Sequence, residues 1–463
     1  MLYQEQAQDL YVEGNRRMAA DDAAGAEALY LQALELDPLH GAARGNLAYV
    51  RQQQGAYAEA ELHFRLALAA LPGNAQLHQN LGVLLLKQKR LAEAEAVLRE
   101  AVALAPESPA AWRHLGVALA CAQRDQEAEA VYRQALSLSA DPEGAEAART
   151  RFNLAYVLLR NGRWTEGWPL LESRWRFDQL PQWFDCPRWQ GERLAGKSLA
   201  IGLEAGQGDM IQFCRYAALA KAQGAARIGV VCHPALKTLF STMAGIDAAW
   251  AYDEAVPAQG WDYWTLPMSM PRWFGTTPDD VPASVPYLHA DPAAAARWSG
   301  RLPQSGLRIG LAWKGNPQFE NDADRSLSSL GELAPLWRAG AAGGVHFISL
   351  QKGPGEDEAA SPPSGVMLHH IAPQLRDFAD TAAVIANLDL VISIDSAVAH
   401  LAGAMGKPCW LLLPDYRCDW RWLTQRADTP WYPNTRLFRQ TQGWPAAIAA
   451  VATELAQLAG VTA

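Results

Sequence analysis

The sequence predicts an all-helical solenoid in its first third and an α/β region with parallel sheets in the remainder. Small residues recur every 34 residues up to about residue 140, which is typical of stacked helical pairs. Beyond residue 197, short β-branched apolar runs alternate with small-residue turns and apolar helical segments. This alternation indicates strand, helix, strand units. With 463 residues, the chain is also long enough for two or three domains.

Composition and charge indicate a globular protein and argue against nucleic acid as a partner, and the first residues argue against a secreted protein. Half of the residues are apolar and 19% are charged, as in folded domains. The formal net charge of -9 offers no basic surface, so we expect no nucleic-acid binding. The first ten residues lack a basic segment followed by an apolar core. We therefore expect a cytoplasmic protein, with peripheral membrane contact left open.

The cysteines and histidines indicate neither a metal site nor a disulfide framework. Six cysteines occur without a CxxC pair, and the ten histidines include no HExxH spacing. Ligand pairs at such short spacings are the usual mark of zinc sites. We therefore expect reduced cysteines, no metal and no cofactor.

The repeats are defined by small residues inside each unit and by a proline after it. Small residues let two antiparallel helices approach closely, and proline ends the second helix. The recurring residues are Ala26, Ala60, Ala94 and Ala128, with Pro38, Pro72 and Pro106 closing the units. The pattern resembles the tetratricopeptide repeat (TPR) family, with four good units from about residue 7 to 140. A degenerate fifth unit carries Gly167 and Pro169 in its second helix; we interpret it as a cap and assign residues 1–175 to the array.

One polar position recurs inside the repeats. Asn46, Asn80 and Asn153 occupy the same position of the first helix in their units. On the inner side of a superhelix they would form a ladder of amides that can donate to and accept from a peptide backbone. This resembles the asparagine ladder of the eukaryotic O-linked N-acetylglucosamine transferases, which implies a protein or peptide partner in the groove. The alternative is that each amide bonds only to a neighbouring helix.

Tryptophan is dense where the repeats end. Five tryptophans occur within 26 residues, namely Trp164, Trp168, Trp175, Trp183 and Trp189. Such a cluster either stacks on carbohydrate or packs between neighbouring domains. We favour packing, and we assign residues 176–196 to a junction.

Residues 197–300 predict the first half of the α/β region. A strand over Ser198–Leu203 is followed by the turn Gly206-Gln207-Gly208-Asp209 and a helical segment over Met210–Gln223. The two glycines permit a tight turn and let a ligand approach the backbone. Asp209 has two interpretations of equal weight. It is either an N-terminal helix cap or, because Gly-x-Gly-Asp at this place resembles the heptosyltransferases, the catalytic base that the resemblance implies.

Residues 307–463 predict the second half, in which three strand ends carry polar residues. The loops are Lys314-Gly315-Asn316-Pro317, Gln351-Lys352-Gly353-Pro354 and Asp395-Ser396, and Arg325 opens a helix after the first. Lysine beside backbone N–H groups suits a diphosphate, which needs a positive charge and a cradle without bulky walls. We therefore predict a phosphate site at this sheet edge.

The second half resembles a known family along a longer stretch. The matching segments are Asp377–Ala382, Leu388–Ser393 and Asp395–Ala404, followed by Gly406-Lys407-Pro408. They resemble the donor-binding half of the heptosyltransferase-like glycosyltransferases. The resemblance implies the GT-B fold, two Rossmann-like halves with a nucleotide sugar bound to the C-terminal one and no metal. In one departure, Ser396-Ala397 replaces the Thr-Gly usual in heptosyltransferases.

The resemblance also implies roles for individual residues. Ser396 and the amides after it would hold the diphosphate, and Lys314, with Lys352 assisting, would neutralise the leaving phosphate. Asp395 and His400 would shape the site near the sugar, although His400 is alternatively a core histidine. The remaining residues expected in the donor site are Gly206, Gly208, Arg325 and Gln351. The tryptophan-rich segment Pro414–Phe438 either covers the nucleotide base or packs against the sheet.

We therefore expect a metal-independent glycosyltransferase that moves a sugar from a nucleotide sugar to an acceptor hydroxyl. Asp209 would remove the acceptor proton, and the repeats would recruit a protein acceptor or partner. Two alternatives remain open. One is a non-catalytic scaffold with a degenerate transferase-like domain, and the other is an enzyme with a lipid-linked or lipopolysaccharide acceptor whose repeats serve only in assembly.

Overall fold

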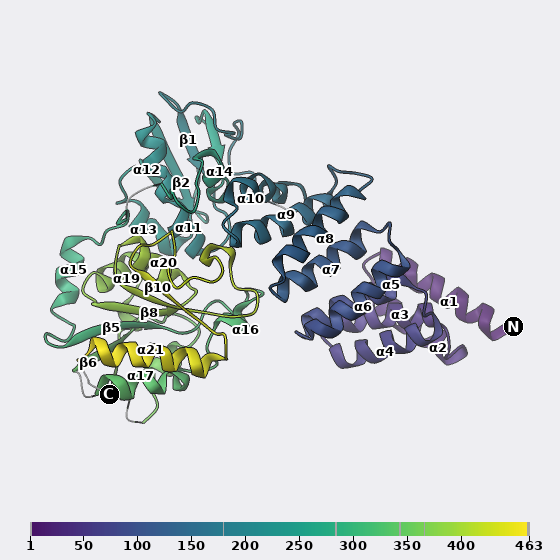
Figure 1. The fold of residues 1–463 in the computed structure, drawn as a ribbon. Helices are drawn as coiled ribbons and strands as arrows, with labels where there is room; N and C mark the ends of the chain where they lie inside the picture. Colours follow the sequence, from purple (N-terminus) through teal and green to yellow (C-terminus); the bar gives the residue numbers. More distant parts are fainter. Residues whose placement is uncertain (1, 179, 283–284, 342–343, 365, 461–463) are drawn as a thin grey trace. The chain divides into compact units, whose positions relative to one another are not determined.

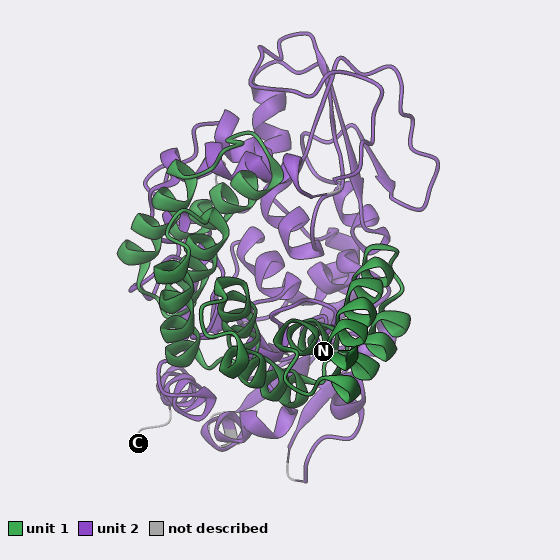
Figure 2. Ribbon diagram, turned by 90° about the vertical axis from the view of Figure 1, so that its right-hand side faces the viewer, with its two compact units in different colours: residues 1–157 green, residues 158–463 purple. Residues whose placement is uncertain are grey.

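The computed structural model describes residues 2–178, 180–282, 285–341, 344–364 and 366–460. The chain forms two compact units, residues 1–157 and residues 158–463, which Figure 2 colours green and purple. The division falls inside helix α9 (Ala145–Arg160). Among the described residues, none of the helices combines the length and the hydropathy that a membrane crossing requires.

Unit 1 is a series of antiparallel helical pairs, labelled along the chain in Figure 1. Its helices before α9 are α1 (Leu2–Ala19), α2 (Ala23–Leu36), α3 (Gly41–Gln53), α4 (Tyr57–Ala70), α5 (Ala75–Lys87), α6 (Leu91–Leu104), α7 (Pro109–Cys121) and α8 (Asp125–Ser137). Each odd-numbered helix from α1 to α7 packs against the helix that follows it. The predicted array of stacked helical pairs is therefore confirmed.

Small residues explain how closely these pairs pack. A Cβ atom added to Gly14 would lie 2.5 Å from a ring carbon of Tyr30. The same distance would separate a Cβ atom on Gly116 from Tyr132, and one on Gly82 from Leu98. Real Cβ atoms do not approach other atoms so closely, so these helices pack in this way only with glycine.

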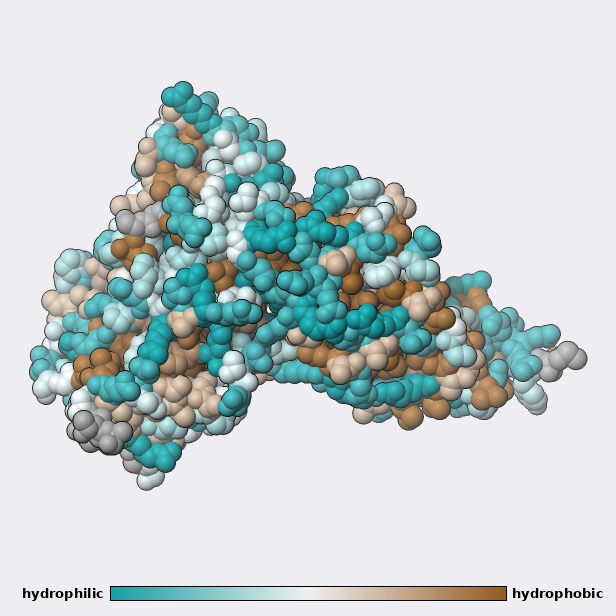
Figure 3. All heavy atoms as spheres, viewed as in Figure 1, coloured by the Kyte–Doolittle hydropathy of each residue, from teal (hydrophilic) through white to brown (hydrophobic). Residues whose placement is uncertain are grey.

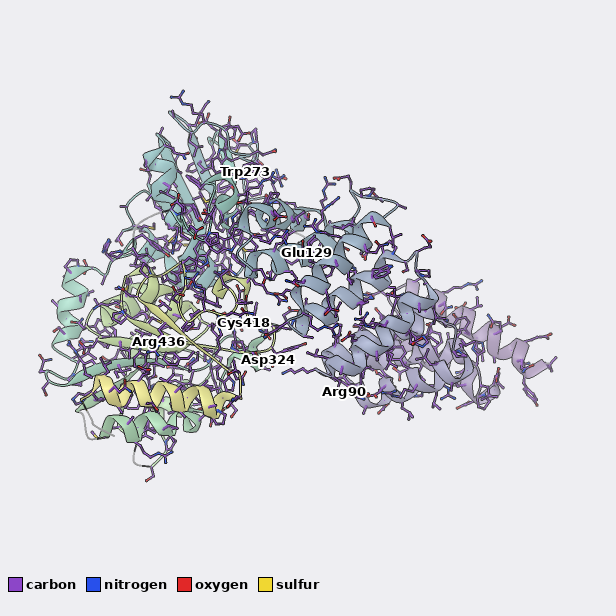
Figure 4. All side chains as sticks on the ribbon, in the orientation of Figure 1. Arg90, Glu129, Trp273, Asp324, Cys418 and Arg436 are labelled. Atoms are coloured by element: carbon purple, nitrogen blue, oxygen red, sulfur yellow. The ribbon has the colours of Figure 1, made fainter. Side chains whose placement is uncertain are left out.

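Ion pairs link successive repeats. Arg90, labelled in Figure 4, contacts Glu61 at 2.5 Å and Glu93 at 2.6 Å. Arg124, one repeat later, contacts Glu95 and Glu127, both at 2.6 Å. Each arginine contacts one carboxylate of its own repeat and one of the repeat before. The same arrangement of ion pairs therefore links neighbouring repeats at two successive places.

Unit 2 begins with α10 (Trp164–Leu171) and the short helix η1 (Glu172–Arg176), and it contains two parallel sheets. The N-terminal half has four strands in the order β3-β2-β1-β4. Its elements are β1 (Ser198–Ile201), α11 (Gln207–Phe213), α12 (Arg215–Ala222), β2 (Arg227–Cys232), η2 (Pro234–Leu236), α13 (Lys237–Phe240), β3 (Ala248–Ala251), β4 (Tyr263–Thr265), η3 (Pro267–Ser269) and α14 (Met270–Trp273).

The C-terminal half has six strands in the order β10-β9-β8-β5-β6-β7. Its strands are β5 (Leu307–Ala312), β6 (Val345–Ser349), β7 (Leu368–His370), β8 (Leu390–Ile394), β9 (Cys409–Leu413) and β10 (Thr435–Arg439). Its helices are α15 (Pro292–Ser299), α16 (Asp322–Arg325), η4 (Leu330–Leu333), α17 (Ala334–Ala341), α18 (Glu356–Ala360), η5 (Ala372–Gln374), α19 (Phe378–Ile385), α20 (Ala397–Ala404), η6 (Trp420–Trp422) and α21 (Trp444–Leu458).

Both halves are doubly wound, as the sequence predicts. In the C-terminal half the chain places β6 and β7 on one side of β5, and β8, β9 and β10 on the other. The strand order therefore reverses between β5 and β8, and ligands bind at such a switch point, outside the carboxyl ends of the strands. The three strand ends predicted to carry phosphate ligands belong to the adjacent strands β8, β5 and β6. The prediction that they share one sheet edge is confirmed.

The tryptophans near the end of the repeats pack inside unit 2. Trp164 and Trp168 on α10 are 1% and 3% exposed. The Trp164 ring stacks on Trp431 at 4.8 Å between centroids, and the Trp168 ring meets Trp420 edge-on at 5.3 Å. Since buried rings cannot stack on a sugar, packing is the role of these two residues.

One predicted helix differs from the structure. The sequence predicts a single helix over residues 210–223, whereas the structure has α11 and α12, separated at Cys214. Cys214 Sγ donates to the carbonyl of Ile211 at 3.1 Å, and Arg215 Nε donates to the carbonyl of Gln212 at 3.0 Å. These side-chain bonds satisfy carbonyls at the end of α11, where the helix is interrupted.

Candidate active site

The turn after β8 exposes the beginning of α20. Ser396 has an extended backbone and precedes the helix, but its side chain does not cap the helix. Its Oγ lies 2.9 Å from Ser393 Oγ, which itself donates to the carbonyl of Ile394. The first turn of α20 therefore keeps backbone N–H groups without a side-chain acceptor, and such groups attract an anion.

Gln351 supports the loop after β5 through hydrogen bonds to its backbone. The Gln351 Oε1 accepts from the backbone N–H groups of Trp313 at 2.9 Å and Lys314 at 3.0 Å, and its Nε2 donates to the carbonyls of Lys314 and Pro354. Gln351 is 3% exposed. Its amide is fully engaged in joining two strand-end loops, so in this structure it supports the site without facing it.

Both predicted phosphate lysines have a carboxylate neighbour. Lys314 Nζ donates to Glu358 Oε1, and the two side chains are 24% and 22% exposed. Lys352 Nζ donates to the carbonyl of Ala372 at 2.9 Å and to Glu356 at 3.3 Å. An ammonium group has three donors, so the bond to Glu358 leaves Lys314 able to bond a phosphate as well.

Arg325 joins the turn after β8 to the loop after β5. Its Nη1 donates to the carbonyl of Asp395 at 3.1 Å, and its Nε donates to Asp322 at 3.2 Å. A Cβ added to Gly315 would lie 2.7 Å from Arg325 Nη2. The structure thus brings Arg325, Gly315 and Asp395 together at the switch point.

Asp395 and His400 lie in one buried cluster. His400 Nε2 is 3.8 Å from Asp395 Oδ1, and His400 Nδ1 is 2.9 Å from the Tyr432 hydroxyl. Trp422 donates its Nε1–H to Asp395 Oδ2 at 2.9 Å, and its ring stacks on the imidazole. Burial holds the pKa of His400 well below its usual range, so the imidazole is neutral. Burial, with the neighbouring carboxylate of Asp419, raises the pKa of Asp395 to about 6.

Asp209 lies at the beginning of α11 and has two partners. Its Oδ2 accepts from the backbone N–H of Gly206 at 2.9 Å, and its Oδ1 accepts from Arg421 Nη2. Asp209 therefore helps to cap α11, but as the third residue of the helix bonding back to Gly206, which is itself the N-cap residue. A Cβ added to Gly208 would lie 2.8 Å from His400 Cδ2. Because α11 also packs on α20, Asp209 and the turn after β8 lie at the same interface between the two halves of unit 2.

The segment η6 contributes residues that the sequence interpretation did not place in the site. It follows the loop that contains Cys418, which Figure 4 labels. Trp420 and Trp422 are each 1% exposed and Arg421 is 4% exposed. Of the two interpretations of Pro414–Phe438, packing is therefore observed for these residues. A signal was present in the sequence, because a charged residue between two tryptophans is unusual on a solvated loop.

The asparagines of the repeats have different surroundings. Asn46 Nδ2 donates to Asn15 Oδ1 at 2.7 Å and to the Tyr30 hydroxyl at 3.4 Å. Asn80 Oδ1 accepts from Gln76 of the same helix at 2.9 Å. Asn153 is half-buried on α9. The bond to a neighbouring helix, which is the alternative to a peptide ladder, is thus observed for Asn46.

Family models match both parts of the chain. Models of the tetratricopeptide repeat match residues 11–75, 51–119 and 111–146. The model of glycosyltransferase family 9 (heptosyltransferase) matches residues 350–411. That match contains the turn after β8 and the first turn of α20.

One curated relative is Protein FlbA of Caulobacter vibrioides, which is 30% identical over 341 residues. The alignment covers 68% of this chain and 56% of FlbA, so the chain spans little more than half the length of this relative. Similar solved structures include PilF of Pseudomonas aeruginosa (TM-score 0.35, 22% identity, 39% of this chain and 81% of that one). MamA of Desulfovibrio magneticus RS-1 has a TM-score of 0.33 and 19% identity, covering 36% of this chain and 92% of that one. The chain thus combines tetratricopeptide repeats with a C-terminal segment similar to the heptosyltransferases of glycosyltransferase family 9.

Proposed function

We propose that the protein is a glycosyltransferase that takes a sugar from a nucleotide sugar and joins it to an acceptor hydroxyl. The observation that carries this proposal is the uncapped beginning of α20 at the switch point of a doubly wound sheet, within the segment that matches glycosyltransferase family 9. A diphosphate suits this place because unpaired N–H groups at a helix N-terminus attract anions.

The donor's leaving group would be stabilised by two neighbouring features. As the bond between the anomeric carbon and the diphosphate breaks, negative charge develops on the departing phosphate. In this proposal the backbone N–H groups of α20 and the ammonium of Lys314, which follows the adjacent strand β5, would meet that charge. Gly315 has no side chain that would clash with Asp322 and Arg325, so these two residues can pack against the loop that carries Lys314.

Asp209 would act as the general base. Asp209 and the turn after β8 (Asp395-Ser396), which we call the donor turn, lie on different halves of unit 2. In this account the half with Asp209 binds the acceptor. The Asp209 side chain is 23% exposed. A carboxylate has about four lone-pair sites, so the bonds to Gly206 and Arg421 leave it able to accept from a hydroxyl. The acceptor oxygen attacks the anomeric carbon while its proton passes to Asp209, and the nucleoside diphosphate departs.

The repeats would recruit a protein acceptor. Large apolar side chains are exposed on unit 1, including Leu31, Tyr49, Leu62 and Leu66. Figure 3 shows hydrophobic residues between hydrophilic ones on this part of the surface. Exposed apolar groups of this kind favour binding to another protein over simple solvation.

Release of nucleoside diphosphate tests the proposal. The full chain is incubated in turn with ADP-, UDP- and GDP-sugars, with water or a protein extract as the acceptor. We expect release from one donor class, and a fall on the order of a hundredfold or more in Asp209→Asn. Asp253→Asn, an exposed aspartate on the loop after β3, is the matched control. Turnover of Asp209→Asn within a few fold of wild type would show that the base is another residue.

A further inference from the structure

Arg421 reaches from one half of unit 2 into the other. It lies on η6 in the C-terminal half, with its side chain 5% exposed. Its Nε donates to Gln212 Oε1 at 2.6 Å, and its Nη2 donates to Asp209 Oδ1. Both acceptors belong to α11 of the N-terminal half. Its Nη1 donates to both oxygens of Asp419, in its own loop, at 3.1 and 3.0 Å.

A guanidinium group is suited to this arrangement. It presents five N–H donors in a rigid plane, so bonds made by three of its nitrogens fix its acceptors relative to one another. Removing a charged group from water is costly unless it is paired and hydrogen-bonded, and the two carboxylates and the Gln212 amide satisfy this requirement. Arg421 therefore orients Asp209 relative to the C-terminal half.

The surroundings of Arg421 are themselves fixed. Trp420 packs edge-on against Trp168 of α10, and Trp422 bonds to Asp395. Leu423, the next residue, has a φ of 54° and a ψ of -170°, a conformation that essentially only glycine adopts without strain. Arg439 Nη2 donates to the carbonyls of Trp422 and Leu423 at 2.7 and 3.1 Å. A strained backbone persists only where its surroundings determine it, and such residues are frequent near functional sites.

The segment η6 thus contacts both the donor turn and the proposed base. Trp422 contacts Asp395 beside the beginning of α20, while Arg421 contacts Asp209 at the beginning of α11. The carboxylate of Asp209 is held at both oxygens, by Gly206 from its own half and by Arg421 from the other. Its orientation toward the donor turn therefore depends on η6.

We propose that Arg421 is a positioning residue that holds the Asp209 carboxylate in register with the donor turn across the interface between the two α/β halves. This proposal rests on the proposed function for its catalytic consequence, but the pairing itself is testable without activity. Lysine cannot replace arginine here, because a single ammonium cannot bond the Asp209, Gln212 and Asp419 side chains in one plane.

A double-mutant cycle tests the pairing. The thermal midpoint of unit 2 in the full chain is measured for Arg421→Met, Asp209→Asn and the double variant, with Arg421→Lys as a milder substitution should Arg421→Met not fold. We expect each single change to lower the midpoint and the double change to lower it by clearly less than the sum. Arg426→Met is the matched control, because Arg426 lies shortly after η6 and pairs with Asp428, whose side chain is 67% exposed. Additive shifts of Arg421 and Asp209 would overturn the pairing.

Chemical rescue tests the positioning role. In Arg421→Ala we expect kcat for nucleoside diphosphate release to fall on the order of a hundredfold, with the KM for the donor changed much less. Guanidinium at low, non-denaturing concentration should restore part of kcat, and ammonium should not. Unchanged kcat, or a fall that guanidinium does not relieve, would contradict the proposal. Absence of turnover in the wild type would instead count against the proposed function. The double-mutant cycle would then be the test of the pairing between Arg421 and Asp209.

Discussion

Arg174 and Glu204 form a buried ion pair, with Arg174 Nε 2.5 Å from Glu204 Oε1. Arg174 lies on η1, within the tryptophan-rich segment, and Glu204 lies in the loop that leads from β1 to α11, the helix that carries Asp209. The other Glu204 oxygen accepts from the backbone N–H of Met268 at 3.2 Å, and Arg174 Nη2 also donates to Ser269. The start of unit 2 therefore braces the loop that leads into the helix of the proposed base.

Breaking this pair should destabilise unit 2. Arg174→Met leaves the Glu204 carboxylate buried and without its main partner, which we expect to lower the free energy of unfolding by about 3 to 5 kcal/mol. Urea unfolding of the full chain measures the change. Arg176→Met is the control, because Arg176 lies on the same turn and is exposed. Equal effects of the two changes on the free energy of unfolding would show that the buried pair contributes no more stability than an exposed arginine.

The tryptophans of α10 should stabilise the α/β unit. Trp168 packs on Trp420 and donates its Nε1–H to the carbonyl of Thr276 at 2.8 Å. Trp168→Ala should lower the free energy of unfolding of unit 2 by about 3 to 5 kcal/mol. Trp112→Ala, in unit 1, should instead affect the transition of the repeats. A loss confined to the repeat transition in Trp168→Ala would contradict the assignment of α10 to unit 2.

Asp395 should make stability depend on pH. Because burial raises its pKa to about 6 in the folded protein, above that of an unfolded aspartate, the folded state binds the additional proton between the two values. The free energy of unfolding therefore falls as the pH rises from about 4 to about 6. Asp395→Asn removes this penalty and should raise stability at pH 8 by about 1 to 3 kcal/mol, with no gain at pH 4.

The control for this pH dependence is Asp389→Asn, at the opposite end of β8. Asp389 Oδ2 accepts from the backbone N–H of Arg308 at 2.8 Å, and its side chain is 39% exposed. Its replacement should not stabilise the protein at pH 8. A gain for Asp395→Asn that is the same at pH 4 and pH 8 would show that ionisation is not its cause.

Charge at the beginning of α20 should decide donor binding. Ser396→Asp and Ser396→Asn introduce nearly identical side chains, and both residues are good N-caps. The aspartate places a negative charge where the diphosphate is expected, so we expect calorimetry to show at least about a tenfold weaker donor affinity for Ser396→Asp than for Ser396→Asn. Equal affinities would place the diphosphate elsewhere.

Asn46 and Asn80 should differ in their effect on the repeats. Asn46→Ala removes bonds to Asn15 and Tyr30 of the preceding repeat, which should cost about 1 kcal/mol of repeat stability. Asn80→Ala removes only a bond within its own helix and should cost less. Urea unfolding followed in unit 1 compares the two. If instead Asn80→Ala abolishes capture of a protein partner while stability is kept, the amide at this position serves the groove.

The fold was largely predictable because its signals are local and repeated. The small residues at a spacing of 34 identify helical pairs, and the strand ends at Lys314, Gln351 and Asp395 follow from apolar runs that stop at polar turns. Parallel strands bring such ends to one edge, so the grouping at the switch point follows from strand order alone.

The tertiary partners were not predictable in the same way. Nothing near Asp209 in the sequence indicates Arg421, which is 212 positions away. Similarly, Gln351 appeared to be a ligand residue because it follows a strand, but its amide bonds the neighbouring loop. Side-chain partners across an interface depend on how two halves pack, and periodicity contains no information about that packing.

Calorimetry of the full chain with ADP-, UDP- and GDP-sugars tests the central claim most directly. The account predicts that one of these donors binds with a stoichiometry of one per chain and that Lys314→Met, which removes the charge beside the switch point, weakens that binding. Failure of every donor to bind would contradict the claim that this sheet edge is a nucleotide-sugar site.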